Sequence, residues 1–271
     1  MPNSNSSSIE ALPSSSRVLG IDVLRGAAAL AVVFSHYLNW WDLHVDDIPF
    51  IAPGLYGYYA VQLFFAISGI VIFNTLNKCH SVRHFAYLRF SRLYPTYWAT
   101  LFGVALISLL AFGQEIWLGG LVANATMFQE FVGYSHFDNV YWSLSAELAF
   151  YAHVAWLFAF GWHRQVHLVC GIWLLAASVW ALTVGKTDTR DMFSLIFVLD
   201  QAAFFALGIM LFQIKKHGIT LTSTFVIGFA LFTSFLVEGV TGLYVAITVF
   251  VLAWLGLFGY LRTLANPVTL W

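Results

Sequence analysis

The sequence predicts an all-α protein, a polytopic bundle of about eight transmembrane helices. Of its 271 residues, 60% are hydrophobic and only 9% are charged, whereas a soluble domain carries about 25% charged residues. So few charged side chains cannot cover a water-exposed surface. The apolar residues also gather into runs close to the length of about 20 residues that a helix needs to cross a bilayer.

The distribution of basic residues supports this number of spans. We predict spans at about 20–41, 55–76, 93–113, 142–161, 166–184, 192–212, 220–237 and 241–261. With the N-terminus in the cytoplasm, all twelve Lys and Arg residues except Lys186 and Arg190 fall on the cytoplasmic side, as the positive-inside rule requires. This topology also requires that residues 114–140 do not cross the membrane, so we expect an outer loop or a re-entrant segment there.

The domain organisation is simple. Residues 1–16 are rich in Ser, Asn and Pro and predict a disordered cytoplasmic tail, and residues 17–271 form one transmembrane domain. Cys79 and Cys170 fall in a basic loop and in an apolar span, so we expect neither a disulfide nor a metal site. The net charge of −1 gives no basic excess that would indicate a nucleic-acid partner.

The first predicted span carries three ionisable residues, Asp22, Arg25 and His36. Because a helix turns about 100° per residue, all three lie on one face, with His36 about 16 Å beyond Arg25. Ionisable residues inside a span are costly to insert and usually functional. The alternatives are that Asp22 and Arg25 only anchor the helix end, and that His36 bonds a neighbouring helix.

Two arginines follow the second span. Arg89 and Arg92 are three residues apart and share a face on a helix, and Pro95 suits the first turn of the third span. We expect both arginines to be exposed to the cytoplasm. Paired guanidinium groups match phosphate geometry, which indicates a site for a phosphorylated cytoplasmic ligand. The alternative is that they only satisfy the positive-inside rule or contact anionic lipid.

The fourth predicted span opens with a polar stripe in which Ser143, Glu147 and Tyr151 recur every four residues. Counted from the outer ends of their spans, Glu147 and His36 lie at similar depth, about 9 Å and about 7–8 Å. We therefore expect the carboxylate to contact the imidazole and fix its tautomer. A purely structural hydrogen bond between the two helices is the alternative.

The second span contains a stretch of small residues that includes Ala66, Ser68 and Gly69. Small side chains let helices approach closely in lipid, so packing is the role that we expect for this stretch. Ser68 as a nucleophile is a weaker interpretation, because the sequence identifies no partner for it.

Four of these blocks occur together, in order, as residues 21–26 with His36, 64–69, 89–95 and 142–151. In this they resemble the membrane-bound acyltransferase-3 family of bacteria, which includes O-antigen and exopolysaccharide O-acetylases. The resemblance implies a multi-pass enzyme of the bacterial inner membrane. Such an enzyme moves an acyl group, usually acetyl, from cytoplasmic acyl-CoA to a hydroxyl of a cell-surface carbohydrate or its lipid-linked precursor.

The resemblance also implies roles for the residues. Arg89 and Arg92, with Arg25, hold the phosphates of acyl-CoA. His36 is the general base or carries the acyl group transiently, and Glu147 orients His36 or balances its charge. The remaining substrate-binding candidates are Asp22, Ser143 and Tyr151. The expected partners are acyl-CoA as co-substrate, the glycan acceptor and membrane lipid, with no tightly bound cofactor.

The sequence departs from the family pattern at its end. In the family, a segment like residues 264–271 leads into further helices that carry a Ser-Tyr pair and a His, and these are missing here. The alternative functions are therefore a multi-pass transporter, since intramembrane charges also mark transport pathways, and a catalytically inactive, truncated relative.

Overall fold

The computed structural model describes residues 19–40, 53–184 and 192–261, and its regular structure is entirely helical. The predicted disordered tail, residues 1–16, lies outside these ranges. The α-helices are α1 (Leu19–Trp40), α2 (Pro53–Leu76), α3 (Val82–Phe112), α4 (Leu118–Ala125), α5 (Trp142–Ala159), α6 (Val166–Thr183), α7 (Met192–Phe197), α8 (Ala202–His217) and α9 (Leu221–Leu257). Short 3-10 turns occupy Glu130–Val132, Asn139–Tyr141 and Trp162–Gln165.

Six helical stretches of the described chain are long and apolar enough to cross a membrane: Leu19–Tyr37, Tyr59–Leu76, Val82–Phe112, Trp162–Thr183, Met192–His217 and Leu221–Leu257. The prediction of a polytopic helical bundle is therefore confirmed. The predicted set of about eight differs in two places. Predicted span 142–161 corresponds to α5, which is not among the six, and α9 contains two predicted spans.

Helix α9 is broken at Gly239, where the sequence predicts the change from one span to the next. Gly239 has φ 70° and ψ −153°, a conformation that glycine adopts readily and L side chains rarely do. Ser234 Oγ donates to the carbonyl of Gly242 at 2.9 Å, whereas groups eight residues apart on a straight helix lie about 12 Å apart. The two halves of α9 therefore fold back on each other.

Helix α3 begins earlier than predicted. Its N-cap is Ser81, whose side chain accepts from the backbone N–H of His84 at 3.2 Å, a favourable way to start a helix. Pro95 therefore lies inside α3, and its predicted place in a first turn is wrong. Hydropathy located only the apolar part of this helix, because its first turns are polar and basic. Arg89 and Arg92 consequently project from continuous helix.

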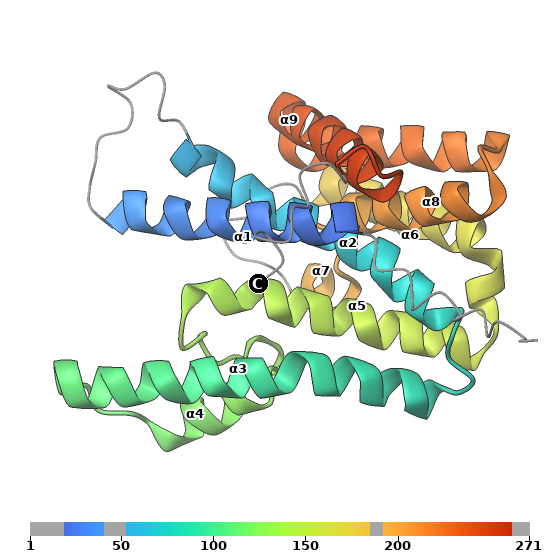
Figure 1. The fold of residues 1–271 in the computed structure, drawn as a ribbon. Coiled ribbons are helices and arrows are strands. Elements are labelled where there is room, and N and C mark those ends of the chain that lie inside the picture. The colour runs from blue at the N-terminus through green and yellow to red at the C-terminus, as the bar shows by residue number, and fades with distance from the viewer. Residues whose placement is uncertain (1–18, 41–52, 185–191, 262–271) are drawn as a thin grey trace, which may run out of the picture.

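Close backbone contacts join α1, α2, α8 and α9 on one side of the bundle, while α3, α4 and α5 form the other (Figure 1). A Cβ on Gly208 of α8 would lie 1.9 Å from the carbonyl oxygen of Ala66 in α2, and one on Gly69 would lie 2.5 Å from that of Phe205. The packing role predicted for the small residues of the second span is thus confirmed for Ala66 and Gly69.

The segment between α3 and α5 lies along the side of α3. The hydroxyl of Tyr97 donates to the carbonyl of Asn124 at 2.6 Å, and Trp98 Nε1 donates to that of Ala125 at 2.8 Å. Asn124 and Gln129 are buried. Helix α4, with eight residues, is too short to cross a bilayer. This segment therefore resembles a re-entrant piece more than a loose outer loop.

Candidate active site

Glu147 is held at the point where α2 and α5 meet. Ser68 Oγ on α2 donates to Glu147 Oε1 at 2.9 Å. The hydroxyl of Tyr151, one turn further along α5, donates to the same oxygen. Among the described residues, no hydrogen bond to the second oxygen, Oε2, is formed. One carboxylate oxygen is thus fixed by two hydroxyl groups.

Three arginines from two helices lie near Glu147 or its hydrogen-bond partner Tyr151. Arg25 of α1 lies within electrostatic range of Asp22, Arg92 and Glu147, and Tyr151 lies within range of Arg89 and Arg92 of α3. We call Arg25, Arg89 and Arg92 the arginine cluster. Within the described ranges, none of the three guanidinium groups has a carboxylate within 4.0 Å. Like charges gathered without ion pairs favour an anionic ligand.

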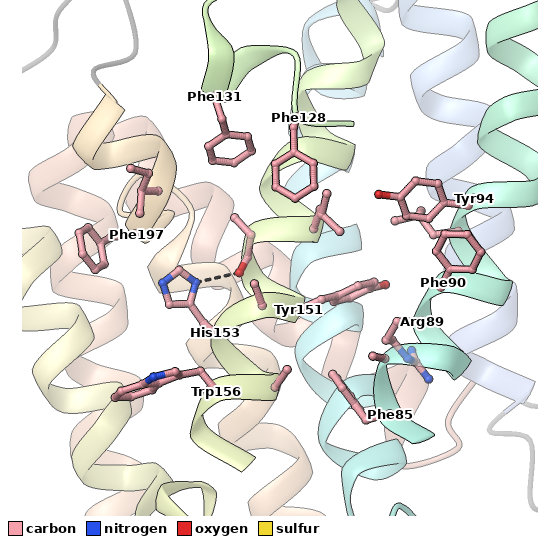
Figure 2. Close-up of a pocket in the computed structure, with 17 residues that line it drawn as sticks. Phe85, Arg89, Phe90, Tyr94, Phe128, Phe131, Tyr151, His153, Trp156 and Phe197 are labelled. Carbon is pink, nitrogen blue, oxygen red and sulfur yellow. Dashed lines mark hydrogen bonds between the residues drawn. The ribbon is translucent and has the colours of Figure 1, made fainter. Parts of the chain in front are cut away.

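Arg89 is buried, which contradicts the prediction that it is exposed to the cytoplasm. Its side chain is 8% exposed, and its Nη2 donates to Thr75 Oγ1 at 2.8 Å. The guanidinium carbon lies 5.8 Å from the ring centroids of both Phe85 and Tyr151. Figure 2 shows the Arg89 side chain beside these two rings. Its Nε is buried without a partner. Arg92, by contrast, is exposed as predicted.

The predicted contact between His36 and Glu147 is wrong. Helices α1 and α2 run antiparallel, and a Cβ on Gly57 would lie 2.4 Å from the carbonyl oxygen of Ala31. Ser68 is eleven residues beyond Gly57, or about 16 Å along α2. Ser68, and Glu147 with it, therefore lies level with the first turns of α1.

His36 lies near the opposite end of α1, about 16 Å from the level of Arg25, and its side chain is exposed. The prediction that Glu147 and His36 lie at similar depth is wrong for a physical reason. It assumed that α5 begins at the outer membrane surface. The preceding segment instead covers the side of α3, so α5 begins within the bundle and Glu147 lies deeper than its position in the sequence suggested.

The two other candidates have different surroundings. Asp22 is half-buried in the first turn of α1 and is one of the charges that act on Arg25. Ser143 lies one turn before Glu147, but its hydroxyl donates to the carbonyl of Val140 at 3.2 Å. Asp22 therefore belongs with the arginine cluster, whereas the Ser143 hydroxyl serves the local turn.

A pocket of about 770 Å³ adjoins the arginine cluster. Its walls come from α3, α5, α7 and the segment before α5 (Figure 2). The aromatic lining residues are Phe85, Phe90, Tyr94, Phe128, Phe131, Tyr151, Trp156 and Phe197. Arg89 of the cluster also lines it, and so does Tyr151, whose hydroxyl donates to Glu147. His153 is on the wall, with its Nδ1–H donating to the carbonyl of Ala149 at 2.8 Å.

Sequence reasoning missed three polar residues around the site, Ser68, Thr75 and His153. Ser68 was assigned to packing because its partner is 79 residues away. No sequence pattern marks Thr75 as a site residue, because its role is to accept the hydrogen bond from Arg89. His153 lies two residues after Tyr151, outside the four-residue stripe that drew attention to α5.

The fold defines a multi-pass membrane protein, and the arginine cluster is its candidate site for an anionic ligand. Residues 18–271 match the acyltransferase domain family Acyl_transf_3. Because this match covers nearly the whole sequence, the chain belongs to that family.

Two relatives illustrate the similarity. The chain is 26% identical over 218 residues to Nodulation protein 10 of Rhizobium leguminosarum bv. viciae, covering 70% of this chain and 58% of that protein. It is 24% identical over 203 residues to "Putative acetyltransferase ORF330" of Acidianus two-tailed virus, covering 74% of this chain and 59% of that protein. The chain thus spans less than two thirds of each relative. No solved structure matches it.

Proposed function

We propose that this protein transfers an acyl group from cytoplasmic acyl-CoA to a hydroxyl of a cell-surface carbohydrate or its lipid-linked precursor, in the inner membrane of a bacterium. The observation that carries the proposal is the arginine cluster around Glu147, whose three guanidinium groups lack carboxylate partners within 4.0 Å in the described chain. Family membership supplies the reaction class. The name of the viral relative, a putative acetyltransferase, supports acetyl as the transferred group.

The donor end of the site is the arginine cluster. Arginine presents a planar fork that bonds phosphate oxygens in pairs. By the positive-inside rule, the start of α3, with Lys78 and Arg83 close by, is cytoplasmic. The phosphates of acyl-CoA would therefore reach Arg92 from the cytoplasm, and Arg25 and Arg89 deeper in the bundle.

The acceptor end is His36, at the other end of α1. As general base, His36 takes the proton of the acceptor hydroxyl while that oxygen attacks the acyl carbonyl carbon. The carbon–sulfur bond then breaks, and the CoA thiolate leaves and takes up a proton. As acyl carrier, His36 first receives the acyl group and then gives it to the hydroxyl. Because Glu147 lies level with Arg25, we assign it to the donor end, where Ser68 and Tyr151 hold its carboxylate.

Donor binding tests this proposal directly. Dissociation constants for acetyl-CoA are measured with the full chain in lipid nanodiscs, for wild type, Arg25→Ala, Arg92→Ala and the control Arg164→Ala. Arg164 is also exposed and basic but lies in the turn before α6. Loss of a charge-assisted hydrogen bond costs about 1.5–3 kcal/mol, or roughly ten- to over a hundredfold in affinity.

The expected result is weaker binding in Arg25→Ala and Arg92→Ala and unchanged binding in Arg164→Ala. Equal affinity in all four proteins would mean that these arginines only satisfy the positive-inside rule and do not bind the donor. The alternative of an inactive relative is tested by measuring acyl transfer. Such a protein would bind acyl-CoA through the same arginines but would transfer no acyl group to any hydroxyl acceptor.

A further inference from the structure

We propose that the pocket beside the arginine cluster holds the acyl chain of the donor, so that the protein accepts acyl groups longer than acetyl. The inference rests on the proposed function, because it needs acyl-CoA to bind at the arginine cluster. It goes further by naming a substrate class, the medium-chain acyl-CoA thioesters.

The first argument is that the pocket meets the arginine cluster and Glu147 at two side chains, Arg89 and Tyr151. Arg89 lines the pocket and donates through Nη2 to Thr75. The Tyr151 ring lines the pocket while its hydroxyl reaches Glu147. A ligand with phosphates at the arginines and an apolar chain in the pocket would cross from one environment to the other at these two residues. An acyl-CoA has that distribution of charge.

The second argument is size and chemistry. A volume of about 770 Å³ falls within the range of small-molecule sites, about 300–1,000 Å³, and the two carbons of an acetyl group would fill little of it. The walls are largely aromatic and aliphatic. Burying one further methylene in such surroundings corresponds to roughly a fourfold gain in affinity, so chain length becomes a measurable determinant of binding.

The third argument separates the donor from membrane lipid as the occupant. The pocket opens at the surface of the bundle, where Phe90, Phe128 and Trp156 are 47–50% exposed, and a lipid tail could also enter. A typical membrane phospholipid brings a single phosphate to the three guanidinium groups, whereas acyl-CoA carries a diphosphate and a further phosphate on its ribose. Charge complementarity therefore favours a chain attached to several phosphates over a phospholipid.

The experiment varies the chain and the pocket separately. Binding and transfer of acetyl-, butanoyl- and octanoyl-CoA are measured with the full chain in nanodiscs, after subtraction of binding to empty nanodiscs. Ala152→Phe on α5 and Ala86→Phe on α3 each place a ring at the pocket from an exposed position. Ala159→Phe is the matched control, because Ala159 is also exposed on α5 but does not line the pocket.

Wild type should bind octanoyl-CoA at least tenfold more tightly than acetyl-CoA. Ala152→Phe and Ala86→Phe should abolish this preference and leave acetyl-CoA binding unchanged, while Ala159→Phe behaves as wild type. The inference is overturned if wild type shows no preference for the longer chain, or if the pocket variants that fold keep that preference; the pocket then holds lipid. If the proposed function itself is wrong, the result is different: Arg92→Ala then leaves the affinity for acyl-CoA of every chain length unchanged.

Discussion

Ser68 Oγ donates to Glu147 Oε1 at 2.9 Å, although the two residues are 79 positions apart in the chain. This bond connects α2 to α5 inside the bundle. Since Tyr151 donates to the same oxygen, the two hydroxyl groups fix the orientation of the carboxylate before any substrate binds. A site whose reactive group is held in this way loses little freedom when its ligand arrives.

Replacing Ser68 by alanine should lower the rate of acyl transfer about ten- to a hundredfold, because a hydrogen bond to a charged group contributes about 1.5–3 kcal/mol. The measurement is kcat/KM for the acyl-CoA donor in acyl transfer. Ser178→Ala is the control: Ser178 is also buried and hydrogen-bonded, at 3.0 Å to Thr233. It should lower stability without a matching loss of rate. Equal losses of rate in the two variants would mean that Ser68 acts only in packing.

His36→Ala and Glu147→Gln should multiply in their effects on acyl transfer. Residues more than about 7–10 Å apart with no shared partner act additively in free energy. His36 lies about 16 Å along α1 from the level of Arg25, and Glu147 belongs to the Arg25 end. Removal of a general base usually costs 10²–10⁴-fold, so the double variant should fall well below His36→Ala. A double variant no worse than His36→Ala would mean that the two residues meet in the working enzyme.

Arg89→Ala and Arg92→Ala should differ in stability while both weaken donor binding. Arg89 is buried and bonds Thr75, so its removal breaks a hydrogen bond between α2 and α3 and leaves a gap beside Phe85. Arg92 is exposed, and its removal should leave the melting temperature unchanged. Thermal unfolding in detergent measures this, with the exposed Arg83→Ala as reference. Identical melting temperatures for all three variants would contradict the burial of Arg89.

Gly208→Ala should destabilise the bundle, because its Cβ would lie 1.9 Å from the carbonyl oxygen of Ala66. Overpacking of this kind typically costs about 1–3 kcal/mol. Gly228→Ala on α9 is the matched control, since nothing lies within 4 Å of the added carbon. Thermal unfolding of both variants in the same detergent should separate them, and an unaltered Gly208→Ala protein would contradict the contact between α2 and α8.

The topology is tested by labelling single cysteines from outside intact cells. Glu115→Cys, three residues after the end of α3, should react with an impermeant maleimide, and Lys216→Cys, at the end of α8, should not. Both native positions are exposed. The native Cys79 and Cys170 are buried, and burial raises the pKa of the Cys79 thiol against the opposing effect of Arg89, so background labelling is low. The reverse pattern would invert the proposed orientation.

The spans were predictable where apolar length and a helix-breaking residue coincide. Gly239 lies between the predicted spans 220–237 and 241–261 and breaks α9. The start of α3 was not predictable from hydropathy, because its first turns are basic and only the Ser81 cap marks them.

The candidate site was predictable in its residue types but not in its grouping. The four-residue stripe located Glu147 and Tyr151 on one face of α5, and they do bond each other. The burial of Arg89 depends on Thr75 and Tyr151 from two other helices, and no local pattern encodes such contacts. The depth of Glu147 in the bundle depends on how the segment before α5 folds. Counting residues from the predicted start of a span does not reveal that fold.

The contact between Gly20 and Gly256 has a consequence for biogenesis. A Cβ on Gly20 would lie 2.3 Å from the carbonyl oxygen of Gly256, so the start of α1 is seated directly against the second half of α9. Chains are synthesised from the N-terminus, and α1 therefore enters the membrane long before its packing partner exists. Until α9 is translated and turns back at Gly239, the helix that carries Asp22 and Arg25 lacks this partner. Ribosome-bound chains that stop before Gly239 should therefore contain an incompletely packed donor site.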